Sequence, residues 1–176
     1  KDGNLFEADG YTGVVNELTP YGVLTPFVTG LATPTGLAFD KAGNLYVSDP
    51  DPFTNLIYKI TPEKVMTTFA SGMNSPDGLA FDKAGNLFVA AFGDKTVFKV
   101  TPDGTVSPFA SLPNGPEGLA FDPAGNLFVA VPVSNAIYRI TPDGTVTPFV
   151  TGLNEPTFLA FGPSAVPEPS SLALLA

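Results

Sequence analysis

The stretch GLAFDPAGNLFVA, residues 118–130, decides the fold because it is repeated along the chain. It recurs as GLAFDKAGNLYVS at residues 36–48 and as GLAFDKAGNLFVA at residues 78–90, in steps of 42 and 40 residues. Shorter versions stand near both ends, DGNLFEA at residues 2–8 and FLAFG at residues 158–162. A period of about 40 residues is typical of repeat architectures in which every unit is one small sheet.

Each repeat predicts four short strands. GLAFD and NLFVA flank an Asp-x-Ala-Gly-Asn turn, whose Gly supplies the positive φ that such a hairpin needs. An apolar third strand, such as residues 137–140, leads through a Thr-Pro-Asp-Gly turn into the last strand. That strand contains Pro108 or Pro148 and should lie at an outer edge, because Pro cannot donate to a ladder. Four strands per unit of about 40 residues predict an all-β fold, a β-propeller of four blades.

The aromatic residues follow the same period. Most of the 15 Phe and 5 Tyr recur in phase with the repeat. Because every unit carries them at matching positions, we interpret them as packing between blades rather than as an aromatic binding site.

The composition of the 176 residues, about one domain in length, excludes several kinds of site. The sequence contains no Cys and no His, so it cannot supply a disulfide, a thiolate nucleophile or a His general base. Lys+Arg 8 against Asp+Glu 17 gives a net charge of −9. Affinity for nucleic acid rests on Lys and Arg that neutralise phosphates, so we expect no nucleic-acid partner.

The unit PxGLAFDxAGNLYVxD, followed by IYKITPDG and FxxGL, resembles the NHL repeat and the related gluconolactonase/regucalcin-type propellers. The resemblance runs from Asp2 to about Gly162. It implies a propeller fold and two classes of function, since such propellers serve both as binding modules and as enzymes. We therefore divide the chain into an NHL-like propeller, residues 1–162, and a tail, residues 163–176.

The two ends of the repeat region complement each other. Residues 1–4 match the turn at residues 41–44, so the first unit lacks its first strand, while residues 158–161 form a first strand without a second. We expect these residues to pair with the strand beginning at Asn4 and to close a ring. The four blades would then be 158–161 with 4–30, 36–72, 78–112 and 118–152. An arc completed by a second copy, or part of a larger propeller, remains an alternative, because an open arc exposes apolar faces and a free strand edge.

The tail carries the sequence VPEPSS followed by LALLA. It resembles the start of a PEP-CTERM sorting signal at Val166, Pro167, Glu168 and Pro169. Such a signal implies export in a Gram-negative bacterium, processing by an exosortase, and an extracellular or cell-surface location. The alternative is an ordinary Pro-rich linker.

One position per unit, directly before the first strand, predicts a residue that lines the central channel, because equivalent positions of successive blades surround the axis. These channel-lining residues are Thr35, Asp77, Glu117 and Thr157. In gluconolactonase/regucalcin-type enzymes the matching PNGL and PDGM sequences hold divalent-metal ligands, and PDGL at 76–79 and PEGL at 116–119 resemble them. The resemblance thus implies Asp77 and Glu117 as ligands of Ca²⁺ or another divalent cation, which prefers oxygen donors. The first-blade Glu and the Asn ligands of that family have no counterpart here, and the alternative is a channel of solvated carboxylates without a metal.

Three further groups have weaker interpretations. The same Asp opens every complete turn of the repeat, at Asp40, Asp82 and Asp122. Its recurrence predicts a side chain that caps backbone N–H groups. The acidic loop SDPDPFTN, residues 48–55, lacks the regular spacing and distal Glu of a calcium loop. Phe53 and Phe92 interrupt the repeat in loops after the second strand and are candidates for a ligand or partner surface.

Two function classes follow. The first is an exported binding or structural module of the extracellular matrix, whose partners are a second copy, a polysaccharide or a surface protein. It is favoured by near-identical units without His or Cys chemistry. The second is a lactonase-like hydrolase, in which Asp77 and Glu117 hold a divalent cation that polarises a carbonyl and activates water.

Overall fold

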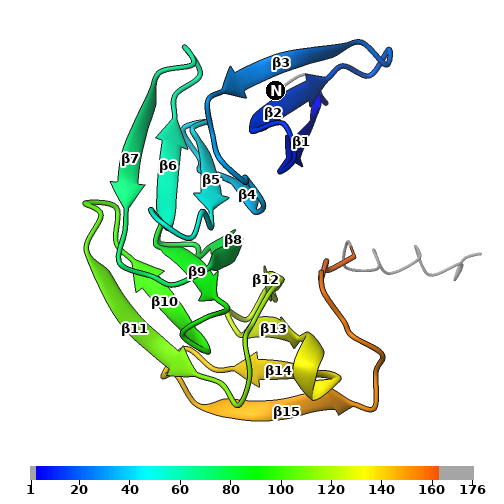
Figure 1. Ribbon diagram of the computed structural model, residues 1–176. Helices are drawn as coiled ribbons and strands as arrows, with labels where there is room; N and C mark the ends of the chain where they lie inside the picture. Colours follow the sequence, from blue (N-terminus) through cyan, green and yellow to red (C-terminus); the bar gives the residue numbers. More distant parts are fainter. Residues whose placement is uncertain (1–2, 163–176) are drawn as a thin grey trace, which may run out of the picture.

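The computed structural model describes residues 3–162 as four antiparallel sheets that follow one another along an arc (Figure 1). The predicted all-β propeller is confirmed, and each sheet is one blade. Within residues 3–162 the helical structure consists of η1 (Pro132–Ser134), a single 3-10 turn. No helix in this part of the chain has the length and apolar character needed to cross a membrane.

The strands of each blade run outward from the centre in chain order. Blade 1 has three strands: β1 (Leu5–Asp9), β2 (Val14–Leu18) and β3 (Leu24–Thr29). Blade 2 contains β4 (Leu37–Phe39), β5 (Leu45–Asp49), β6 (Leu56–Ile60) and β7 (Met66–Ala70). Blade 3 contains β8 (Pro76–Phe81), β9 (Leu87–Ala91), β10 (Thr96–Val100) and β11 (Val106–Ser111). Blade 4 contains β12 (Leu119–Phe121), β13 (Leu127–Val131), β14 (Ala136–Ile140) and β15 (Val146–Thr151).

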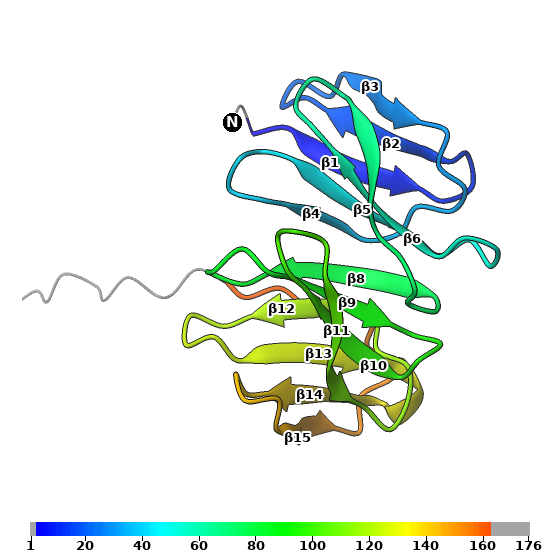
Figure 2. The same ribbon diagram turned by 90° about the vertical axis from the view of Figure 1, so that its left-hand side faces the viewer.

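The core lies between the blades, one apolar cluster at each interface. The side chains of a strand alternate between its two faces, so one blade packs on both neighbours. In β5, Val47 packs with Val15 of blade 1, whereas Tyr46 packs with Leu87 of blade 3. Figure 2 shows the sheets stacked face to face in this way.

The in-phase aromatic residues pack between blades, as predicted. The ring of Tyr46 lies 4.8 Å from that of Phe69 in its own blade and 5.0 Å from that of Phe81 in the next, both edge-to-face. The same triplet recurs at the other interfaces, centred on Phe6, Phe88 and Phe128. Edge-to-face pairs add about 0.5–1.5 kcal/mol each beyond their buried area.

The Pro-containing strands β11 and β15 lie at the outer edges of their sheets, as predicted. The register of each shifts by one residue opposite its neighbour, between Val97 and Phe98 and between Ile137 and Tyr138. The shift lets Pro108 and Pro148 occupy an edge where their missing N–H leaves no ladder bond unmade.

The predicted closure of the ring within one chain is wrong. The sheet of blade 1 has three strands, and in the described part of the chain residues 158–161 form no strand on β1. These residues follow blade 4 instead, where the N–H of Gly118 donates to the carbonyl of Thr157 over 2.8 Å. The arc set by packing of successive blades is still open after blade 4, so β1 and residues 158–161 lie on either side of the opening (Figure 1). The tail with Val166, Pro167, Glu168 and Pro169 lies outside the described residues.

Candidate functional site

The four predicted channel residues occupy one end of the inner strands. We call this the linker end, because the segments that join consecutive blades enter the inner strands there; the Asp-x-Ala-Gly-Asn turns form the opposite turn end. Asp77 is the second residue of β8, Glu117 stands two residues before β12, and Thr35 stands two residues before β4. Thr157 has the matching place in the segment after blade 4.

Neighbouring inner strands touch at this end. A Cβ atom added to Gly78 would lie within 3.0 Å of the carbonyl oxygen of Glu117, and one on Gly118 would meet that of Thr157. Since these contacts leave no room for side chains, Gly is required at both positions. The equivalent residues of successive blades are thereby held side by side around the axis.

A small central cavity of about 180 Å³ lies below these contacts. Its walls come from the first residues of the inner strands: Gly36, Leu37, Gly78, Leu79, Gly118, Leu119, Phe158 and Leu159. The side chains of these residues are apolar, and the cavity also exposes polar backbone atoms of the inner strands.

Asp77 lies close enough to Glu117 at this mouth to affect the ionisation of Glu117. Burial raises the pKa of Asp77, and a hydrogen bond from Thr35 opposes that rise. Burial also raises the pKa of Glu117, and the negative charges of Asp77 and Glu155 add to the rise. Desolvation and a like charge both disfavour the ionised carboxylate. The mouth therefore concentrates negative charge that a cation would relieve.

Ser48 is a site residue that the sequence analysis missed. Its buried hydroxyl accepts from the N–H of Gly36 over 2.7 Å, donates to the carbonyl of Asp77 over 2.6 Å, and lies 3.0 Å from the hydroxyl of Thr35. Ser48 thus joins blade 2 to the strand that carries Asp77. One signal was present in the sequence, because the other units have Ala at this position.

Glu155 was missed as well. It stands two residues before Thr157, where the other units have Thr33, Ser75 and Gly115. Its backbone has a positive φ of 45°, and its N–H donates to the side chain of Asn135 over 3.1 Å. This arrangement brings a third negative charge to the side of Glu117.

The donors at the mouth suit a hard cation only in part. Carboxylates and hydroxyls are the ligands that Ca²⁺ and Mg²⁺ prefer. Within residues 3–162, however, no three His, Cys, Asp or Glu side chains converge on a point that could hold a metal ion. Asp77 and Glu117 therefore form at most part of a coordination shell, and Glu155 acts on Glu117 through its charge.

A sequence model of the SMP-30/gluconolactonase/LRE-like region family matches residues 2–114, more than half of the chain. The chain belongs to this family. No curated protein matches the sequence significantly. The match supports the gluconolactonase part of the predicted resemblance, whereas the resemblances to NHL repeats and to PEP-CTERM signals stay predictions.

Solved structures of the same fold are longer than this gluconolactonase-like chain. A gluconolactonase from Xanthomonas campestris is 20% identical with a TM-score of 0.77, the match covering 90% of this chain and 62% of that one. Virginiamycin B lyase from Staphylococcus aureus is 18% identical with a TM-score of 0.76, covering 90% and 56%. At this identity the likeness concerns the fold. The chain spans about three fifths of the length of these neighbours.

The acidic loop of the gluconolactonase-like chain is used for structure. The buried carboxylate of Asp49 accepts from the N–H groups of Ala32 and Thr33 over 2.8 and 2.7 Å. The side chain of Asn55 accepts from the N–H of Ser75 over 2.8 Å. Both residues hold linkers between blades, so their oxygens do not face a common ligand.

The recurrent Asp residues cap the turns, as predicted. The carboxylate of Asp122 accepts from the backbone N–H and the side-chain amide of Asn126 over 2.8 and 2.7 Å. Asp40 and Asp82 make the same pair of bonds with Asn44 and Asn86. These bonds satisfy the polar groups of the tight turn, which explains why the repeat keeps Asp and Asn together.

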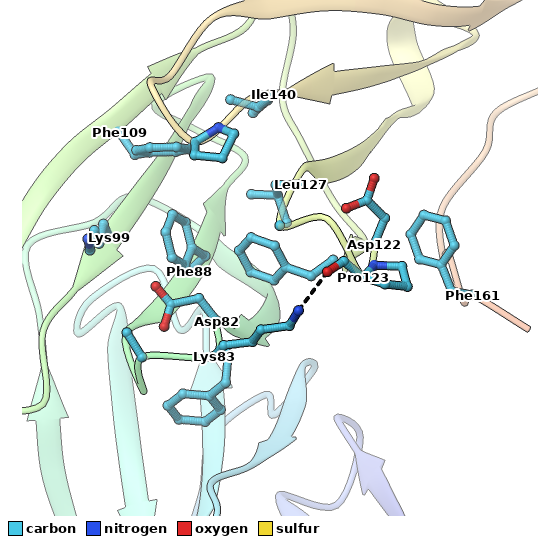
Figure 3. A pocket seen from close by; sticks show the side chains of 15 residues that line it. Asp82, Lys83, Phe88, Lys99, Phe109, Asp122, Pro123, Leu127, Ile140 and Phe161 are labelled. Atoms are coloured by element: carbon cyan, nitrogen blue, oxygen red, sulfur yellow. Dashed lines mark hydrogen bonds between the residues drawn. The ribbon is translucent and has the colours of Figure 1, made fainter. Parts of the chain in front are cut away.

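A cavity of about 590 Å³ lies at the turn end between blades 3 and 4 (Figure 3). Phe88, Phe109 and Phe121 line it, and the ammonium of Lys83 donates to the carbonyl of Pro123 over 2.6 Å at its rim. Similar cavities of about 310 and 470 Å³ occur at the other two interfaces. Because the cavity recurs with the repeat, we attribute it to the way that blades splay apart.

The loops after the second strands present apolar side chains at the linker end. Tyr11 is 98% exposed and Phe53 92% exposed, and Phe92 and Val133 are also exposed in the matching loops of blades 3 and 4. The sequence analysis singled out Phe53 and Phe92 and missed Tyr11 and Val133. All four residues belong to loops at the linker end, the end of the arc that also carries the acidic mouth.

Proposed function

We propose that the linker-end mouth is part of the site of a gluconolactonase-like hydrolase, and that Asp77 and Glu117 are this chain's contribution to a divalent-cation site there. The observation that carries the proposal is the pairing of these two carboxylates at the mouth, each with a raised pKa. Membership of the SMP-30/gluconolactonase/LRE-like region family supports the reaction class.

A bound divalent cation would polarise the carbonyl of a cyclic ester. The chain's own residues hold the two carboxylates in place: Ser48 bonds the backbone of Asp77, and Thr35 bonds its side chain. Further oxygen donors are needed for a full shell, and we propose that water molecules and the substrate supply them.

We do not propose the lyase activity of the Staphylococcus aureus neighbour. A solved complex of that enzyme with quinupristin used a catalytically inactive variant in which a His is replaced by Ala. The 176 residues of this chain contain no His that could take such a role.

Thermal melting tests the cation site. In the parent chain, millimolar Ca²⁺ or Mn²⁺ should raise Tm relative to EDTA, because a ligand that binds only the folded state stabilises it by mass action. The double variant Asp77→Asn/Glu117→Gln should lose the rise. Glu63→Gln, a neutralised carboxylate in an exposed turn away from the mouth, is the matched control and should keep it. A parent that shows no rise contradicts the cation site.

Lactone hydrolysis tests the reaction class. Hydrolysis that depends on the cation and is lost in Asp77→Asn supports the proposal. A Ca²⁺-dependent rise in Tm without hydrolysis of any γ- or δ-lactone would instead favour a binding module that uses a cation.

That binding module is the second candidate function, and the exposed side chains at the linker end favour it. Tyr11 and Phe53 could stack on sugar rings of an extracellular polysaccharide or dock on a surface protein. Co-sedimentation with insoluble polysaccharides should be reduced in the variant Tyr11→Ser/Phe53→Ser. Tyr21→Ser is the matched control, because Tyr21 is equally exposed but lies at the turn end. Equal loss in both variants would contradict a ligand surface at the linker end.

We further propose that the protein is exported to the cell surface or the medium of a Gram-negative bacterium and processed by an exosortase. The resemblance of Val166, Pro167, Glu168 and Pro169 to a PEP-CTERM signal supports this. In a host with an exosortase, the parent should be processed and Pro167→Ala/Glu168→Ala should not. Retention of both proteins inside the cell would contradict export.

A further inference from the structure

The turn-end cleft between blades 3 and 4 has a volume of about 590 Å³, against about 310 Å³ for the cleft between blades 2 and 3. The splay of the blades opens both clefts, so the difference comes from the residues that line them. We propose that the larger cleft binds a small aromatic monoanion, such as an aryl carboxylate. None of the residues used here belongs to the acidic mouth, so this inference stands apart from the proposed function.

Three aromatic rings line this cleft. The ring of Phe88, in β9, lies 4.9 Å from that of Phe109 in β11 and 5.1 Å from that of Phe121 in β12, both edge-to-face. Phe88 is buried, whereas Phe109 and Phe121 are half-buried, so part of each of these two rings is accessible. A cavity of this size with apolar and aromatic walls has the usual form of a small-molecule site.

One oxygen atom distinguishes these rings from those of the smaller cleft. Tyr46 takes the place of Phe88 between blades 2 and 3, and its hydroxyl donates to the carboxylate of Asp40 over 3.4 Å. Phe88 has no hydroxyl with which to reach Asp82, although both residues line the larger cleft. The missing oxygen leaves the larger cleft more room and a more apolar wall. The repeat thus supplies its own comparison.

Two ammonium groups bring positive charge to the cleft. The ammonium of Lys99 lies over the ring of Phe88, 5.9 Å from its centre. The ammonium of Lys83 reaches from blade 3 to blade 4, where it donates to the carbonyl of Pro123 over 2.6 Å (Figure 3). That bond uses one of the three donors of an ammonium group. Both lysines line the cleft, so a ligand that lies against the rings can place an anionic group beside them.

The two carboxylates that line the cleft already have partners. Asp82 accepts from the backbone N–H and the side-chain amide of Asn86 over 2.8 and 2.7 Å. Asp122 makes the same pair of bonds with Asn126. Since each carboxylate caps its own turn, the lysines are the groups with free capacity for a ligand. Charge complementarity therefore favours an anion.

Two fluorescent probes test the ligand class. Anilinonaphthalene sulfonate has an aromatic body with one negative charge, and anilinonaphthalene is the same body without the charge. The folded parent should bind the sulfonate saturably, with increased emission, and more tightly than the neutral compound. Lys99→Gln should weaken binding of the sulfonate about fivefold, as expected for a charge pair that water partly screens. The same variant should bind the neutral compound as the parent does.

The smaller cleft provides the controls. Lys59 lies over the ring of Tyr46 at 5.7 Å, as Lys99 lies over Phe88, so Lys59→Gln should change neither affinity. Phe88→Tyr introduces the residue that blade 2 already accommodates, and it should weaken binding of both probes while Tm stays close to that of the parent. A parent that binds neither probe saturably overturns the proposal, as does equal loss in the two Lys variants. So does a neutral probe that binds as tightly as the sulfonate, or a Phe88→Tyr variant that binds both probes like the parent.

Discussion

A Cβ atom on Gly36 would lie within 3.0 Å of the carbonyl oxygen of Asp77 in the next blade, closer than side chains approach backbone in folded proteins. This contact has two consequences. It places the strand that carries Asp77 directly beside the strand that follows Thr35, which builds the mouth. It also lets neighbouring blades meet at the centre, where any larger residue would push them apart.

Gly78→Ala tests how much the central contact contributes to stability. The added methyl group would collide with the carbonyl of Glu117, so the free energy of unfolding should fall by about 1–3 kcal/mol. Gly162→Ala is the control, because nothing lies within 4 Å of its added Cβ. Thermal melting should show a lower Tm for the first variant alone. Equal Tm values would contradict the close approach of the inner strands.

Ser48→Ala should lower the free energy of unfolding by less than the loss of a buried hydroxyl usually does. In blade 4, which has Ala130 at this position, the N–H of Gly118 donates directly to the carbonyl of Thr157 over 2.8 Å. Gly36 can make the same bond to Asp77 once the hydroxyl is gone. We expect a loss below about 1 kcal/mol, against the 1–3 kcal/mol of an unsatisfied buried group. Chemical denaturation measures it, and a loss above that range would show that the hydroxyl is indispensable.

The repeat in the sequence was sufficient to predict the blades, because each strand and turn depends on residues close in the chain. Asp122 with Asn126, and Pro148 in an outer strand, illustrate such local rules. The closure of the ring was not predictable in this way. The curvature of the arc, which keeps residues 158–161 away from β1, depends on packing summed over all the blades.

The candidate site was predictable only at its repeat positions. Asp77 and Glu117 stand out because they share one position of the unit. Ser48 and Glu155 act across blades, through a hydroxyl bond and a charge, and neither belongs to a motif. The burial that raises the pKa of Asp77 likewise depends on its neighbours in space. These neighbours cannot be read from the sequence.

Phe121→Ala and Phe161→Ala compare an inner strand of a complete blade with the segment that follows blade 4. Phe121 packs on Phe88 between two complete blades, so its truncation should cost about 3 kcal/mol. Phe161 makes the same contact with Phe128 but is half exposed, so we expect about half that loss. Urea unfolding measures both. No loss for Phe161→Ala would contradict the docking of residues 158–161 on blade 4.

Asp122→Ala tests the turn cap. Hydrogen bonds from Asn126 lower the pKa of Asp122, so the ionised carboxylate stabilises the folded chain. That stability is present above the ordinary pKa of 3.8 and is lost as the pH falls through the lowered value. The variant should melt about 2–4 °C below the parent near neutral pH, and the difference should shrink in acid. A difference that is the same at every pH would point to a packing effect instead.

The acidic mouth should show the opposite dependence on pH. The pKa values of Asp77 and Glu117 are raised above their ordinary 3.8 and 4.5, the first chiefly by burial and the second by burial and the charge of Asp77. The folded chain therefore holds these protons more tightly than the unfolded chain. The stability that this contributes is complete below the ordinary values and is lost as the pH rises through the raised ones. In EDTA near pH 7, Asp77→Asn/Glu117→Gln should thus melt about 2–4 °C above the parent, and near pH 3 the two should melt together. Glu63→Gln, at an exposed turn, is the control and should leave Tm unchanged at both pH values. A double variant that is less stable than the parent at neutral pH would show that the two carboxylates do not repel each other at the mouth.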